Sequence, residues 1–156
     1  MLIVLLICNF ICTSCSNDNG LHETELEQAY QAYVDARKAA FLDFNADRLA
    51  DTVTSDYLHV LEQHISTREQ AGNRIQEEIQ VREFKILFYG ETVATVQVTQ
   101  EYLYIPPNES VDHYSESYWQ SETKKCEFTR SWKIVDGIVE NGNWLPNYCE
   151  LVASDL

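Results

Sequence analysis

The chain reads CEFTRSWKIVDGIV from residue 126 to 139, and this stretch predicts a β-hairpin. Apolar runs flank the pair Asp136-Gly137, and an Asp-Gly pair in that setting is the strongest short signal for a two-residue hairpin turn. With that turn, Val135 pairs with Ile138. The hairpin then joins the last two strands of an antiparallel sheet.

The hairpin register also bears on two cysteines. It places Cys126 opposite Asn147, with Cys149 as the diagonal neighbour on the same face, and a β-bulge would bring the two cysteines opposite each other. In an oxidising compartment they can form a disulfide, and otherwise they are two free thiols. Both alternatives stay open. No histidine clusters with them in the sequence, so we expect no metal site.

The first part of the chain predicts helices. Thr24 and Glu27 form a capping box at the start of a long helix. Asn45 follows this helix and is expected to cap a second, short helix over 46–53. Apolar residues recur at helical spacing along the long helix; they are Leu26, Tyr30, Tyr33, Val34, Phe41 and Phe44.

The rest of the chain predicts strands, with one further helix between them. Ser66 and Glu69 form a second capping box, which is expected to begin a helix over 67–79. Residues 109–125 allow either another strand or a projecting hairpin. Apolar and polar residues alternate in the expected strands, which cover 57–61, 84–88, 94–104 and 126–135, with a last strand after the Asp-Gly turn.

This order of elements predicts an α+β fold, because helices come first and an antiparallel meander follows. A strongly curved antiparallel sheet wrapped around the long N-terminal helix would bury the apolar faces of both. About 140 residues follow the apolar leader, which is enough for one domain with a hydrophobic core. We expect this domain to cover 22–150, with a short tail over 151–156.

The first 17 residues carry no ionisable side chain apart from cysteine, so the formal net charge of −14 lies on the remainder. The apolar run MLIVLLICNFIC is too short to span a bilayer and predicts an export signal. Its end, Thr13-Ser14-Cys15, resembles a bacterial lipoprotein signal, in which Cys15 becomes lipidated. An ordinary cleaved signal and an uncleaved anchor are the alternatives. We expect a signal over 1–15, a polar tether over 16–21, and a lipid-anchored protein in the periplasm or at the cell surface.

The composition excludes several classes of function. The chain has 25 acidic and 11 basic residues, and such a surface repels the phosphates of nucleic acids. The sequence contains no glycine-rich phosphate loop, no serine nucleophile elbow and no HExxH motif. We therefore expect no cofactor. Glu77 and Glu78 are expected on the solvated face of a helix.

Three segments carry a resemblance to a known superfamily. They read FNADRLADTV at 44–53, ISTREQ at 65–70 and FTRSWKIVDG at 128–137. They resemble the nuclear-transport-factor-2-like superfamily, which includes ketosteroid isomerases and polyketide-cyclase-like domains. The resemblance covers the chain from about Glu25 to Leu145. It implies a cone-shaped α+β barrel with a pocket at its open end, where Asp, His or Tyr side chains act without a metal.

Arg130 is the most informative candidate in that pocket. It shares a strand face with Phe128 and Trp132, and a guanidinium on an apolar face needs a carboxylate or a ligand. It either anchors an anionic ligand or forms a structural ion pair with Asp35 or Asp47. We expect the ion pair, because the chain is rich in carboxylates.

A catalytic function would use His59 or Asp56 to remove a proton alpha to a carbonyl group. Tyr102 or Arg130 would then stabilise the enolate. An imidazole titrates near pH 6.5, which suits a general base. In the predicted strand over 57–61, one phase points His59 inward and the other points it to solvent.

Two functions from different classes therefore remain open. The first is a non-catalytic module that binds a small hydrophobic ligand or a protein partner, as a homodimer through the outer face of the sheet. The second is an isomerase, dehydratase or cyclase. We expect the first, because the candidate residues form no recognisable catalytic constellation, and the fold alone does not decide. The side chains expected to bind the ligand are Arg130, Tyr104, Trp132, Tyr57 and Tyr33.

Overall fold

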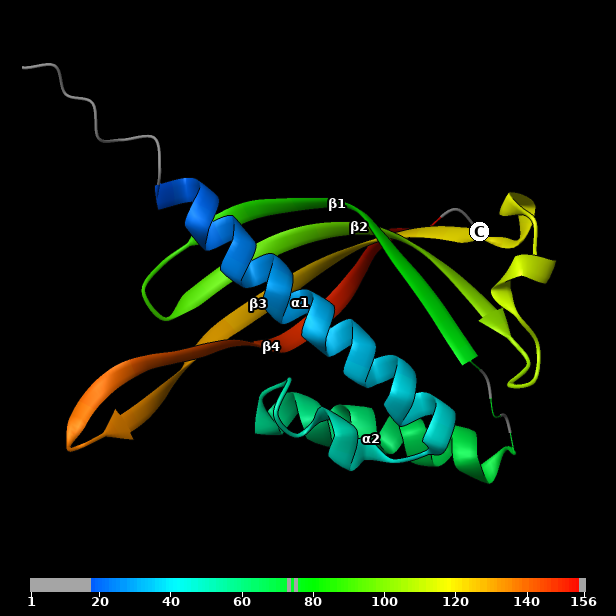
Figure 1. Cartoon of the computed structure of the whole chain (residues 1–156), viewed down its shortest axis with the longest axis horizontal. Coiled ribbons are helices and arrows are strands. Elements are labelled where there is room, and N and C mark those ends of the chain that lie inside the picture. The colour runs from blue at the N-terminus through cyan, green and yellow to red at the C-terminus, as the bar shows by residue number, and fades with distance from the viewer. Residues whose placement is uncertain (1–17, 73, 75, 155–156) are drawn as a thin grey trace, which may run out of the picture.

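The computed structural model describes residues 18–72, 74 and 76–154. Figure 1 shows a strongly curved sheet with a long helix, α1, lying along its concave face and a second helix, α2, beside it. The sheet has four antiparallel strands in the order β1-β2-β3-β4. The predicted α+β class and the curved sheet around an N-terminal helix are therefore confirmed. Within the described residues, no helix combines the length and the apolar character needed to cross a membrane.

Helix α1 (Asp18–Asp43) begins earlier than the capping box predicts. The Thr24 hydroxyl donates to the Gly20 carbonyl at 2.9 Å, so Thr24 lies within the helix. Residues 18–21, expected in a polar tether, are also helical. The predicted apolar stripe is buried at Leu26, Tyr30, Tyr33, Val34 and Phe41. Its last member, Phe44, follows the helix and is only half-buried.

A short 3-10 helix, η1 (Ala46–Leu49), follows α1. Asn45 caps it as predicted, because its side-chain oxygen accepts a hydrogen bond from the Asp47 amide at 3.0 Å. The element ends at Leu49, earlier than the expected helix over 46–53. Leu49 and Val53 are both buried, as their apolar side chains in this segment indicated.

Helix α2 (Ser55–Gln70) replaces two predicted elements. The expected strand over 57–61 is helical, and the expected helix over 67–79 is wrong beyond Gln70. The buried residues of α2 are Tyr57, Leu61 and Ile65, spaced four apart on one helical face. A five-residue apolar run fits both a strand and one turn of a helix. The spacing of four residues that continues to Ile65 indicates the helix.

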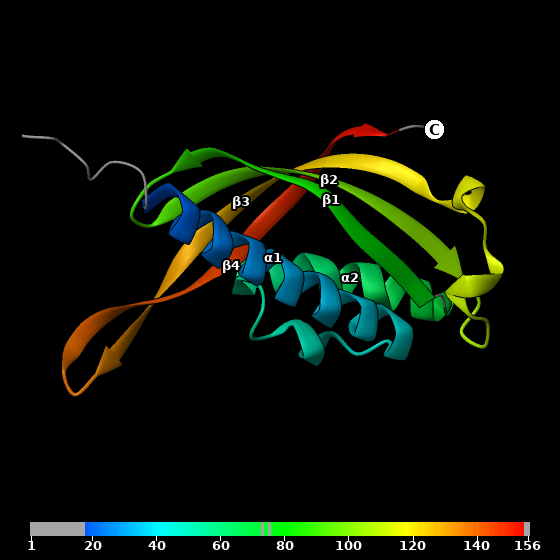
Figure 2. The same ribbon diagram turned by 45° about the horizontal axis from the view of Figure 1, so that its top comes forward.

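The strands form a meander, in which each strand pairs with the next one along the chain (Figure 2). The tail expected from residue 151 belongs to the last strand as far as Ser154. Residues 109–118 form neither a strand nor a hairpin but include two single-turn 3-10 helices, at Val111–His113 and Glu116–Tyr118. The strands are β1 (Gln76–Tyr89), β2 (Val93–Ile105), β3 (Gln120–Val135) and β4 (Ile138–Ser154).

The β3–β4 hairpin has the predicted turn, and Val135 pairs with Ile138. Asp136 and Gly137 have φ angles of 51° and 79°, the left-handed conformations that a two-residue hairpin turn requires. Two register shifts, rather than one bulge, lie between the turn and Cys126. They bring Cys126 opposite Cys149, and the two sulfur atoms are bonded at 2.10 Å.

We expect the disulfide to contribute substantially to stability. The bond links residues 23 positions apart and restricts the unfolded chain. The Cys126→Ala/Cys149→Ala double variant should lose about 2–4 kcal/mol of unfolding free energy in a urea titration. As a control, a reducing agent should lower the stability of the wild type and leave the double variant unchanged. If reduction did not change the unfolding free energy of the wild type, this result would contradict the disulfide.

Candidate functional site

The interior of the cone is closed at one end by a buried carboxylate. Glu77 on β1 is only 1% exposed. Arg37 of α1 donates its Nε–H to Glu77 Oε2 at 3.0 Å, and Arg68 of α2 places Nη1 3.3 Å from Oε1. A buried carboxylate is tolerated only when it is paired, and here two guanidinium groups pair it. The prediction that Glu77 lies on a solvated helix face is wrong, because this segment is a strand.

Two tyrosines expected to bind a ligand lie beside this ion-pair cluster. The hydroxyls of Tyr33 and Tyr57 are 3.1 Å apart, and Arg37 donates Nη1–H to the Tyr33 hydroxyl at 3.3 Å. Burial raises the pKa of Tyr57 well above its usual value, so its hydroxyl stays neutral. Both hydroxyls are engaged with protein groups, and their role here is to stabilise the packing of α1 on α2.

A second chain of hydrogen bonds crosses the sheet. Tyr30 of α1 donates its hydroxyl proton to Gln100 Oε1 at 2.6 Å, and Gln100 Nε2–H donates to Glu122 Oε1 at 2.7 Å. Lys124 then pairs with the same carboxylate oxygen of Glu122 at 2.6 Å. Burial also raises the pKa of Tyr30 above its usual range. The polar groups of this chain of hydrogen bonds therefore satisfy one another, whereas the buried Nη1 of Arg68 contacts Glu77 as an ion pair but has no hydrogen-bond partner among the described residues.

Tyr102 and Tyr104 lie at the edge of this interior. Their ring centroids are 5.1 Å apart, and the Arg68 guanidinium lies 5.4 Å from the centroid of Tyr104. Burial raises the pKa of both hydroxyls. Beyond Gln100 the strand buries Leu103 instead, so the predicted inward face does not continue to Tyr104.

His59 and Asp56 lie on the exposed side of α2. The His59 side chain is 72% exposed, with Nδ1 3.4 Å from a carboxylate oxygen of Glu62 and Nε2 3.3 Å from the amide nitrogen of Gln63. The inward phase considered for His59 required a strand, and the structure has a helix. The structure does not bring His59 or Asp56 to the cavity that contains Arg130.

An open cleft lies at the other end of α1. Its volume is about 550 Å³, and it is bounded by α1, the segment before α2, and strands β3 and β4. Its apolar wall consists of Ala29, Ala32, Trp144 and Leu145. Its polar rim includes Glu25, Asp51, Arg130, Asn141 and Asn143. No group of side chains in the described part of the chain is arranged to hold a metal ion.

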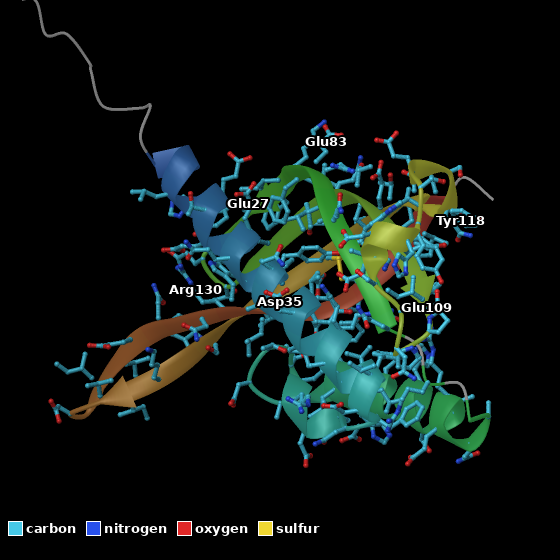
Figure 3. The ribbon with its side chains drawn as sticks, turned by 45° about the vertical axis from the view of Figure 1, so that its right-hand side comes forward. Glu27, Asp35, Glu83, Glu109, Tyr118 and Arg130 are labelled. Carbon is cyan, nitrogen blue, oxygen red and sulfur yellow. A yellow bond between two sulfur atoms is a disulfide. The ribbon has the colours of Figure 1, made fainter. Side chains whose placement is uncertain are left out.

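Arg130 lines this cleft, and its side chain lies beside the N-terminal half of α1 (Figure 3). Its Nη2–H donates to Glu25 at 2.8 Å, and its guanidinium lies 4.7 Å from the centroid of the Trp144 ring. The expected ion pair is present, but its acid is Glu25 and not Asp35 or Asp47. Among the described residues, the buried Nε of Arg130 and Nε1 of Trp144 find no hydrogen-bond partner.

The register shift between Arg130 and Trp132 explains why the predicted site differs from the observed one. It breaks the alternation along β3, and Trp132 becomes 56% exposed on the hairpin. Trp144, paired with Arg130 in the ladder, is buried in its place. Glu25 carried a sequence signal, since it directly precedes Leu26, where the buried stripe begins. Asn141 carried none, because its position depends on this irregular register.

Two solved structures share this architecture. The chain is similar to the intermembrane space region of chloroplast protein ARC6, with a TM-score of 0.53 and 10% identity over 84% of this chain and 96% of that one. It is also similar to a protein from Catenulispora acidiphila, with a TM-score of 0.51 and 12% identity over 85% and 93%. The fold is of the nuclear-transport-factor-2-like type. No protein-family model and no curated protein matches the sequence.

The Tyr30–Gln100 hydrogen bond provides a test of the interior network. Replacing Tyr30 by Phe leaves a buried amide oxygen without its donor. We expect the free energy of unfolding to fall by about 1–3 kcal/mol. Tyr118→Phe is the matched control, because that side chain is 60% exposed, and its effect should stay within about 0.5 kcal/mol. Equal effects of the two substitutions in urea titrations would contradict the network.

Proposed function

We propose that this protein is a non-catalytic binding module that holds a small molecule in the cleft beside Arg130 and Trp144. The observation that carries the proposal is an open cavity of about 550 Å³ that combines an apolar wall with a polar rim. Small-molecule sites typically measure about 300–1,000 Å³ and combine apolar walls with a few convergent polar groups. An acceptor atom on the ligand would pair with the side-chain amides of Asn141 and Asn143, which are exposed at the rim.

The charges around the cleft favour a neutral or cationic ligand. Glu25 and Asp51 carry two negative charges and Arg130 carries one positive charge, so the rim has a net charge of −1 at neutral pH. The whole chain carries −14, which further repels polyanions. Because Glu25 already pairs with Arg130, the guanidinium is not a free anchor for a carboxylate or phosphate. The ligand class is a small molecule with an apolar part and a carbonyl-type acceptor.

Binding is favoured over proton abstraction because the proposed base does not line the cleft. His59 and Asp56 lie on the exposed side of α2 and are absent from the cavity wall. The carboxylates that do line it, Glu25 and Asp51, are at the rim, and Glu25 is engaged with Arg130. We therefore assign the cleft to recognition.

We further propose that the protein acts outside the cytoplasm, anchored by a lipid at Cys15. The support is the sequence alone: an uncharged apolar leader that ends in Thr13-Ser14-Cys15. Cys15 lies outside the described residues. A single acyl chain gives only reversible attachment, so a stable anchor needs more than one chain or a second contact with the membrane.

Filling the cleft should abolish ligand binding without disturbing the core. Ala32 is exposed on the cleft wall, so Ala32→Trp places an indole in the cavity. Gln31 is its neighbour but lines a separate groove beside Val81 and Phe84, so Gln31→Trp is the matched control. In native mass spectrometry of protein purified from its host, we expect a bound small molecule on the wild type and Gln31→Trp, and none on Ala32→Trp.

The same experiment can also contradict the proposal. A wild-type protein that carries no small molecule, or an adduct that survives equally in Ala32→Trp, would overturn the assignment of the cleft. The mass of the released molecule would give its class. A polyanion such as a nucleotide would contradict the charge argument even if it occupied the cleft.

A further inference from the structure

The end of the β3–β4 hairpin presents an unusual concentration of exposed apolar side chains. We name it the hairpin tip and define it as residues 132–139. Figures 1 and 2 show this hairpin projecting beyond the helices and the rest of the sheet. Its exposed apolar residues are Trp132 (56%), Ile134 (75%), Val135 (42%), Ile138 (65%) and Val139 (63%). Apolar patches of this kind on a soluble protein commonly mark an interaction site.

The hairpin tip is apolar on both of its faces. Ile134 pairs with Val139, and paired residues of an antiparallel ladder point to the same side. Val135 pairs with Ile138 and points to the opposite side. A flat protein surface could cover only one of these faces. A medium that surrounds the hairpin, such as the interface of a lipid bilayer, covers both.

The position of the hairpin tip agrees with a membrane as its partner. In the three views, the tip and the start of α1 lie toward the same end of the molecule (Figures 1–3). The chain that precedes α1 is the uncharged apolar leader of 17 residues. A membrane at that end of the molecule can therefore contact both the start of α1 and the hairpin tip.

The charge of the hairpin tip differs from that of the rest of the chain. It contains one Lys and one Asp, Lys133 and Asp136, so its net charge is zero, whereas the whole chain carries −14. An acidic surface is repelled by anionic lipids. The hairpin tip, which has no net charge, can therefore approach an anionic membrane without electrostatic repulsion.

We propose that the hairpin tip inserts into the interfacial layer of the membrane and is a second point of attachment beside the N-terminal anchor. The proposal rests on the proposed export and anchoring of the chain. Trp132 would lie at the level of the head groups, where indole rings are favoured, and the four aliphatic side chains would enter the acyl region. Backbone groups between β3 and β4 are already paired, which limits the cost of insertion to the outer edges of the hairpin.

The test uses the full chain, with its leader, extracted from host membranes and reconstituted into phosphatidylcholine vesicles with brominated acyl chains. Bromine quenches the fluorescence of an indole that lies within the acyl or interfacial layer. We expect quenching of the wild type and of Trp119→Phe, and its loss in Trp132→Phe. Trp119 is the matched control, since it follows Tyr118 at the opposite end of the molecule (Figure 3).

Vesicle flotation separates this proposal from the proposed anchor. If the chain floats with the vesicles but Trp132→Phe is quenched as strongly as the wild type, or the wild type is not quenched, insertion of the tip is wrong and the anchor stands. If Cys15→Ala floats with the vesicles as the wild type does and its Trp132 is still quenched, the tip binds lipid and the anchor is wrong. With neither flotation nor quenching, both are wrong.

A second variant keeps all three tryptophans and removes part of the apolar surface. Ile134→Ser/Val139→Ser alters one exposed face of the hairpin and leaves Trp132 in place. We expect it to lose Trp132 quenching while its disulfide and urea unfolding remain unchanged. If sedimentation shows instead that the wild type is a dimer without lipid and this variant is a monomer, the tip binds a second copy of the chain, and the membrane proposal is overturned.

Discussion

The pairing of one buried carboxylate with two guanidinium groups constrains the rest of this structure. Glu77 lies in the first strand, Arg37 in the long helix and Arg68 in the second helix. A carboxylate that is 1% exposed must keep its partners, because removal of one partner of a buried pair is strongly destabilising. The three elements are therefore fixed together at one end of the cone.

This closure places the open space at the other end of α1. The interior near Glu77 is filled by tyrosines whose hydroxyls bond to one another and to Arg37. Toward the N-terminal half of α1, small side chains at positions 29 and 32 leave a cleft above the Trp144 ring. The same end carries the projecting hairpin. Ligand recognition and membrane contact, as proposed, thus share the end of the molecule that the buried ion pairs do not close.

The sequence predicted the elements whose signals are local. The Asp136-Gly137 turn, the Asn45 cap and the apolar stripe of α1 depend on neighbouring residues, and all three were predicted correctly. The strand over 57–61 was wrong, because a short apolar run fits both periodicities until the whole stretch to Ile65 is considered. Glu77 was misplaced because the predicted helix over 67–79 extended across the start of β1.

The candidate site was harder to predict because it depends on non-local register. Arg130 was identified because a charge on an apolar strand face needs a partner. Its partner, Glu25, is 105 residues away in the sequence, and many acids in the chain could have served. Trp144 reaches the cleft through one irregularity of the β3–β4 ladder, between Arg130 and Trp132, which no local pattern revealed.

The central claim is that the buried pair at Glu77 holds the helix and the sheet together. A double-mutant cycle with Arg37→Met and Glu77→Gln measures it directly, and the adjacent pair Lys38–Glu78, which joins the same two elements in a more exposed setting, is the control. We expect the Arg37–Glu77 coupling to be about 1–3 kcal/mol and the Lys38–Glu78 coupling to stay below about 1 kcal/mol. Equal couplings for the two pairs would contradict the claim.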